Sequence, residues 1–177
     1  MQFSGARNMK WTVDVFELAR EARRVAGEVE SADLVRLAPM LARPEGRIQF
    51  QIHGWTDPAG RCAASLELHG QLKLTCDLCG SELDWTLDPA SVGFFFVEDE
   101  AQLSALPISV EGDEPLLGSR HFDLLDLVED QTILSLPISP RHPGCERTAR
   151  SDRKSDDSRT HPFAQLAALK RGRTDVK

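Results

Sequence analysis

The chain has 177 residues, of which 41% are apolar and 28% charged, with 21 Lys and Arg against 28 Asp and Glu. This length suits one globular domain with a real core, and the apolar fraction excludes wholesale disorder. The longest apolar run, residues 94–97, is far shorter than the roughly 20 residues of a membrane helix, and no signal peptide is recognisable, so we expect a cytoplasmic protein.

The first predicted elements are helical. Apolar residues at helical spacing predict a short amphipathic helix over residues 14–26, with Gly27 as its C-cap. The next segment, residues 31–40, reads as a weak helix or turn that Pro39 and Pro44 stop, because proline cannot donate the backbone hydrogen bond of a continuing helix.

Strands are predicted mainly over residues 46–97. Ile48, Phe50 and Ile52 alternate with polar residues, which is typical of a strand with one wet face. Residues 62–88 predict a long hairpin whose apolar positions are even-numbered and whose tip is rich in cysteine. Residues 94–97 predict a further strand, whereas residues 98–115 show no firm pattern.

A helical period returns over residues 123–136 and ends at Pro137. The fold class we expect is therefore α+β, with a mostly antiparallel sheet and two helices packed on it. Asp126, Glu129 and Asp130 are expected on the outer side of the later helix, where they either bind a basic partner or form an ordinary polar surface.

Charge is divided unevenly along the chain. Residues 61–140 carry 3 basic and 15 acidic groups, whereas residues 141–177 carry 10 basic and 5 acidic groups. We expect a single domain over residues 1–145, a disordered linker over 146–160 and a short basic helix or tail over 161–177. The tail either contacts RNA or a partner, with Phe163, Leu166 and Arg171 as candidate contact residues, or only keeps the chain soluble.

Two pairs of potential metal ligands stand out. Cys76 and Cys79 lie three residues apart before Gly80, and His142 and Cys145 repeat this spacing after the later helix. Such pairs suit a tetrahedral structural zinc site, provided that the fold brings together segments separated by about 60 residues. Cys62 is an alternative donor, although its position in the alternation places it on the inner side of a strand.

Other interpretations of these cysteines stay open. They are either reduced thiols without a metal or a redox pair, although a redox pair usually has a helix N-terminus beside it and strands flank this motif. A metal-dependent nuclease is a further alternative. No complete set of acid, base and nucleophile is visible, so we expect no enzyme and no small-molecule substrate.

Several motifs occur in an order that resembles one bacterial family. Residues 125–138, followed by Pro140, His142 and Cys145, resemble the signature of the YceD family, the large ribosomal RNA subunit accumulation proteins. Cys76 and Cys79 match the family's Cys-x-x-Cys, and residues 161–170 resemble its closing Asn-Pro-Phe motif. Smaller N-terminal similarities are at residues 16–19, at Gly27 and at residues 36–37.

The resemblance implies a non-enzymatic factor for the synthesis, processing or stability of large-subunit ribosomal RNA. Its implied partners are the precursor RNA, a ribosomal protein or an assembly factor. Leu78 and Gln131 stand where the family commonly has an arginine and an acidic residue, so the roles of those two groups do not carry over. A structural zinc module for a different partner remains the alternative from another class.

Overall fold

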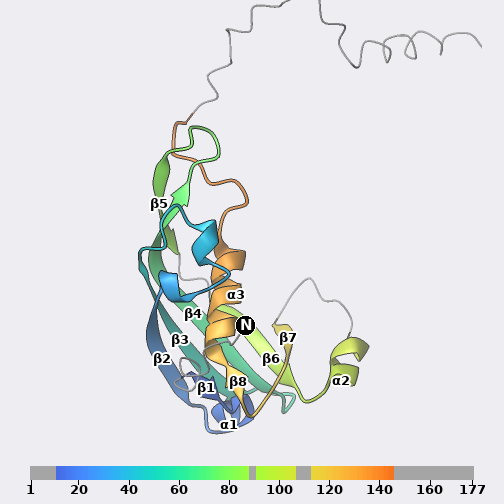
Figure 1. Cartoon of the computed structure of the whole chain (residues 1–177). Coiled ribbons are helices and arrows are strands. Elements are labelled where there is room, and N and C mark those ends of the chain that lie inside the picture. Colours follow the sequence, from blue (N-terminus) through green and yellow to red (C-terminus); the bar gives the residue numbers. More distant parts are fainter. Residues whose placement is uncertain (1–10, 88–90, 107–112, 146–177) are drawn as a thin grey trace, which may run out of the picture. The chain divides into compact units, whose positions relative to one another are not determined.

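A 14-residue strand, β4 (Cys62–Thr75), organises the fold (Figure 1). The structure is a computed structural model that describes residues 11–87, 91–106 and 113–145. Two 3₁₀ turns, Ser31–Asp33 and Ala38–Met40, connect strand β2 (Arg24–Glu30) to strand β3 (Arg47–Thr56). The other elements are β1 (Thr12–Val13), α1 (Val15–Arg20), β2 (Arg24–Glu30), β3 (Arg47–Thr56), β5 (Glu82–Leu87), β6 (Val92–Val97), α2 (Glu100–Ala105), β7 (Glu114–Leu117), β8 (Phe122–Asp123) and α3 (Leu124–Ser135).

The main sheet has the order β2-β3-β4-β6-β7, and β5 also pairs with β4. β6 lies against the first part of β4, from Ala63 to Leu66, whereas β5 lies against its last part, from Gly70 to Thr75. The pairs β2–β3, β3–β4, β4–β5 and β4–β6 are antiparallel. In contrast, β7 runs parallel to its neighbour β6. The α+β class with a mostly antiparallel sheet is thus confirmed.

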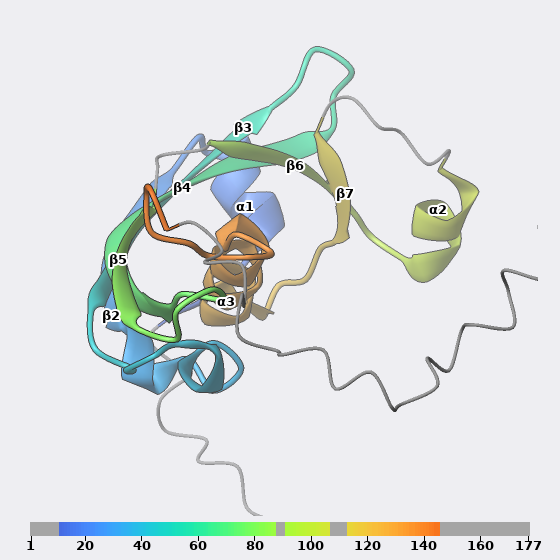
Figure 2. The ribbon, with the colours of Figure 1, turned by 90° about the horizontal axis from the view of Figure 1, so that it is seen from above.

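The sheet curves around α1 and α3, as Figure 2 shows. The even-numbered side chains of β4 point to this concave side, because successive side chains of a strand alternate between its two faces. The core combines these with apolar residues of β3 and of both helices, and all are nearly inaccessible to solvent. Its largest fully buried side chains include Phe94, Leu18, Ile48, Ile52, Leu66, Leu72 and Leu124.

A smaller apolar cluster lies on the opposite face of the sheet. Phe95, Val97 and Ala63 form it, and Leu103 and Leu106 from α2 and the residue after it pack against it together with Trp55. β6 is therefore buried on both faces, which explains why its residues 94–97 are continuously apolar instead of alternating.

The predicted helix over residues 14–26 is wrong in its second half. α1 ends at Arg20, Ala22 has a positive φ of 50°, and residues 24–30 form β2 along β3. Gly27, the expected C-cap, lies inside this strand, where a Cβ would come within 2.2 Å of the Trp11 ring. Pairing with a long neighbouring strand outweighs a helical spacing that only four residues supported.

The later helix agrees closely with its prediction. α3 covers Leu124–Ser135, within the expected residues 123–136, and the Asp123 side chain caps it by accepting a hydrogen bond from the Leu125 N–H at 2.9 Å. Residues 98–115, which had no pattern, contain α2 and the start of β7. Within the described residues, none of the helices is long and apolar enough to cross a membrane.

Gly54 fixes how closely α1 approaches β3. A Cβ at this position would lie 2.5 Å from the Leu18 carbonyl oxygen and 2.9 Å from the Ala19 Cα, so backbone would have to move. We expect Gly54→Ala to lower the free energy of unfolding by about 3 kcal/mol, measured by urea denaturation. Gly60→Ala is the control: φ is +81° but a Cβ meets nothing within 4 Å, so only backbone strain of about 1 kcal/mol is expected. Equal losses in the two variants would contradict this account.

Candidate metal centre

The first pair of candidate ligands lies in the turn between β4 and β5. Backbone hydrogen bonds close this turn, from the Cys76 N–H to the Ser81 carbonyl at 2.8 Å and from the Gly80 N–H to the Cys76 carbonyl at 2.9 Å. Gly80 has a φ of +75°, which glycine adopts without strain. Cys76 is buried and Cys79 is exposed, so the turn holds one thiol against the core and offers the other to solvent.

The second pair comes from the segment that follows α3. The Asp77 N–H donates to the Pro140 carbonyl at 2.9 Å and so ties this segment to the turn. The His142 Nε2 lies 3.0 Å from the Glu82 carbonyl oxygen, and its Nδ1 lies 3.5 Å from the Cys79 Sγ. Because a carbonyl only accepts, Nε2 carries a proton, which leaves Nδ1 as the nitrogen that faces the thiols.

The fold brings all four predicted ligands together. The ligand atoms of Cys76, Cys79, His142 and Cys145 all lie within 4.8 Å of one another. Around a tetrahedral ion with bonds of about 2.0 to 2.3 Å, ligand atoms are separated by about 3.3 to 3.8 Å. The group could therefore hold a metal ion after a small inward rotation of its side chains. Cys62, the alternative donor, starts β4 at the end opposite Cys76 and does not belong to this group.

The same geometry favours the thiolate form of Cys76. The Cys79 backbone N–H, followed by those of His142 and Leu78, lowers the pKa of Cys76 to about 5 by hydrogen bonding to the charged sulfur. The pKa of His142 is raised, first by its hydrogen bond to Cys76 and then by its contact with the Glu82 carbonyl. Thiolates are the form that binds metal, so the protein chain alone already prepares one ligand.

The three acidic residues of α3 do not form the single outer surface that the sequence predicted. Asp126 and Asp130 are exposed, but Glu129 is only 5% exposed. The prediction for Glu129 is therefore wrong. Its Oε1 accepts hydrogen bonds from the backbone N–H groups of Arg36 and Leu37, at 2.6 and 3.0 Å.

Arg36 completes this contact from outside. Its Nε donates to the Glu129 Oε2 at 3.0 Å, its Nη1 donates to Asp130, and its Nη2 donates to the Asp126 carbonyl at 3.3 Å. The hydrogen bond to Glu129 is the main cause of a raised pKa for Arg36. The position of Arg36 in the sequence carried no signal of this role, since 93 residues separate it from Glu129.

The family model of the large ribosomal RNA subunit accumulation protein YceD matches residues 64–170, more than half of the chain. The chain belongs to the YceD family. No solved structure matches it closely.

The YceD match begins within β4 and includes all four candidate metal ligands and α3. β2 and β3, with the N-terminal similarities at residues 16–19, at Gly27 and at residues 36–37, lie outside it. The match also spans Phe163 and Leu166, whereas Arg171 follows it. All three of these tail residues, with the linker and basic helix expected over residues 146–177, lie outside the described residues.

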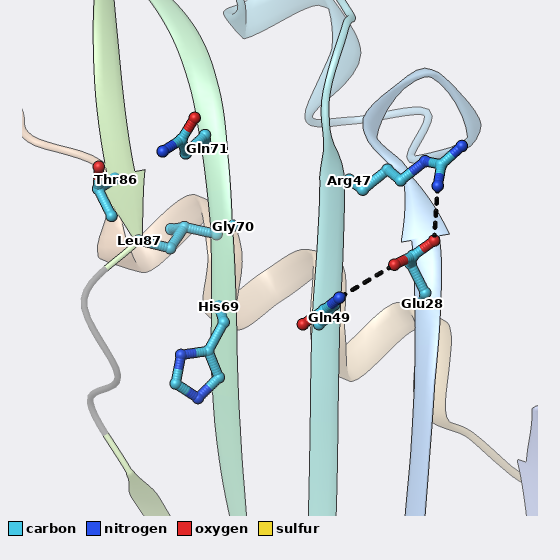
Figure 3. Close-up of a pocket in the computed structure, with 8 residues that line it drawn as sticks. All are labelled: Glu28, Arg47, Gln49, His69, Gly70, Gln71, Thr86 and Leu87. Carbon is cyan, nitrogen blue, oxygen red and sulfur yellow. Dashed lines mark hydrogen bonds and ion pairs between the residues drawn. The ribbon is translucent and has the colours of Figure 1, made fainter.

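The outward face of this YceD-family sheet carries a shallow polar hollow of about 560 Å³ (Figure 3). Glu28 on one side binds Gln49 at 3.1 Å and Arg47 at 3.3 Å, so the charges there compensate each other. His69 and Gln71 line the hollow from β4. No pattern in the sequence predicted this hollow, which is open to solvent and contains the ion pair between Glu28 and Arg47.

Proposed function

We propose that this YceD-family chain is a non-catalytic ribosome-biogenesis factor that is needed for the accumulation of large-subunit ribosomal RNA. The observation that carries the proposal is the family match over residues 64–170. Its partners are the large-subunit precursor RNA, a ribosomal protein or an assembly factor. The acidic residues 61–140 favour a basic protein as the partner of the folded part, and the basic residues 141–177 favour contact of the tail with RNA.

The metal centre has a structural role in this proposal. Three thiols and one imidazole are a ligand set of structural zinc sites, and four protein ligands leave no open position for a substrate or an attacking water. Zinc would join the hairpin tip to the segment after α3. The set of four protein ligands therefore favours structural zinc over a metal-dependent nuclease, because the metal of a nuclease needs an open coordination position.

A thiol oxidoreductase has weaker support. The lowered pKa of Cys76 would suit one, but this thiol is only 1% exposed, so a disulfide substrate would not reach it. The turn that carries Cys76 is flanked by strands, β4 and β5, and in the described part of the chain no helix starts next to it in the sequence. Backbone N–H groups aimed at sulfur are equally suited to a metal-bound thiolate.

The experiment that tests the proposed function measures ribosomal RNA in cells that lack the protein. We expect the ratio of large- to small-subunit ribosomal RNA to fall, because the precursor is made less, processed less or degraded faster. Pulse labelling followed by a chase distinguishes these three causes. Expression of the full chain should restore the ratio, and an unchanged ratio in its absence would refute the proposal.

A further inference from the structure

Exposed large apolar side chains occur in two places: the last turn of α3 with the residues that follow it, and the neighbouring segment of residues 31–44. Across residues 11–87, 91–106 and 113–145, five such side chains are exposed, and four of them come from these two places. The fifth, Leu117, is 40% exposed and lies in β7. The four define what we name the α3 patch: Val35 at 75% exposed, Met40 at 51%, Leu134 at 72% and Ile138 at 104%.

Hydrogen bonds hold the two parts of the patch side by side. Arg36, next to Val35, binds Glu129 and Asp130 of α3, and Leu134 follows Asp130 by one helical turn. Figure 1 shows the segment of residues 31–44 alongside α3. The two segments that carry these side chains are therefore neighbours, although about 100 residues of sequence separate them.

The backbone that carries the patch is fixed. The Leu37 N–H donates to the buried Glu129 carboxylate, and the Leu136 N–H donates to the Ile133 carbonyl at 3.1 Å. Beyond Ile138, the Pro140 carbonyl accepts the hydrogen bond from Asp77 that ties this segment to the hairpin tip. A docking surface that is already ordered loses little conformational entropy on binding, so this arrangement suits recognition.

The charge around the patch indicates the kind of partner. The two segments that carry the patch, residues 31–44 and 121–141, contain five acidic residues and three arginines. Two of these arginines are already paired, Arg36 with Glu129 and Asp130 and Arg43 with Glu82. Asp126 and Asp130 are both exposed on this side of α3. Such a surface repels the phosphates of RNA and attracts basic groups.

We propose that the α3 patch docks a basic protein of the large ribosomal subunit through apolar side chains of that protein. This inference rests on the proposed function, which supplies the setting, and goes beyond it by naming the surface and the chemistry of the partner. Leu134 and Ile138 insert into the partner, and Asp126 faces its basic groups. Exposed aliphatic side chains at the centre with charges around them are the usual arrangement of a protein interface.

Binding of the purified full chain tests the proposal. The probes are the total proteins extracted from large ribosomal subunits and, separately, the protein-free large-subunit RNA. We expect the wild type to retain a basic protein from the first pool, and the same protein to bind when it is purified alone. Leu134→Ser combined with Ile138→Ser should weaken this binding about tenfold, the usual effect of losing central apolar contacts.

Two further variants separate the contributions. Leu117→Ser removes an exposed apolar side chain from β7 and should bind as the wild type does. Asp126→Asn should weaken binding at low salt and make it less dependent on salt. All three changes are at exposed positions, so unchanged thermal unfolding should accompany them.

Three results would overturn the proposal. The first is that the wild type and the Leu134 and Ile138 double variant bind the basic protein equally well. The second is that the double variant loses binding to RNA. The third is that the wild-type chain associates with itself and the double variant does not. As the only copy in cells, the double variant should lower large-subunit RNA as a deletion does. Normal RNA with this variant, in cells where deletion lowers it, refutes the docking surface alone, whereas normal RNA after deletion refutes the proposed function.

Discussion

Replacing Cys76 by serine is expected to remove the bound metal and to lower the thermal stability of the protein. Cys76 is the buried member of the ligand group, and its sulfur lies within 4.8 Å of the other three ligand atoms. Wild-type protein purified without chelators should contain one zinc ion per chain by elemental analysis, and the Cys76→Ser variant should contain much less.

The size of the effect follows from linkage between binding and folding. At a free zinc concentration a thousandfold above the dissociation constant, binding contributes about 4 kcal/mol to stability. For a chain of this size, that corresponds to a melting temperature about 10 °C lower without metal. Most of the buried core comes from residues outside the hairpin tip, so the variant should remain folded below this lower temperature.

Cys62→Ser is the matched control, because Cys62 is a partly buried thiol at the other end of β4. It should retain the zinc ion. A wild-type protein that is folded and free of metal, or equal metal loss in both variants, would contradict the zinc centre.

Replacing Glu129 by alanine is expected to cost about 3 kcal/mol of unfolding free energy, because it leaves the Arg36 and Leu37 N–H groups without their acceptor. This is the lower end of the range for broken buried ion pairs, since the Arg36 side chain is 50% exposed and water screens its charge. Urea denaturation measures the loss.

Asp130→Ala is the control for Glu129→Ala. It removes a carboxylate that also binds Arg36 but is 51% exposed, so we expect a loss of at most about 1 kcal/mol. If both variants lose the same amount, the burial of Glu129 is not what makes its contact important.

Sequence periodicity was sufficient for the parts of the fold that depend on local pattern. The alternation along β4 and the helical spacing in α3 each extend over many residues, so both elements could be located, although the outer side of α3 was assigned wrongly at Glu129. The helix prediction failed over residues 21–26 because the helical spacing was short and a neighbouring strand, β3, determines the conformation there. A local sequence pattern does not indicate which strands pair with one another.

The predictions for the candidate sites also succeeded for local features and failed for features that depend on tertiary contacts. The two ligand pairs could be found because each pair is local and has a spacing typical of metal sites. The burial of Glu129 could not be predicted, because its partner Arg36 lies on a segment without a periodic pattern of apolar residues. A carboxylate next to two other acidic residues on a helix normally faces water, and only the tertiary contact reverses this.

The order of the strands also affects how the chain folds during synthesis. β2, β3, β4 and β5 pair with their sequence neighbours and can form early, whereas the contact between Arg36 and Glu129 spans 93 residues. At translation rates of about 5 to 20 residues per second, α3 leaves the ribosome about 5 to 20 s after Arg36. Until then the apolar concave side, with Phe50 and Leu66, lacks the cover of α3 and is exposed to water and to aggregation.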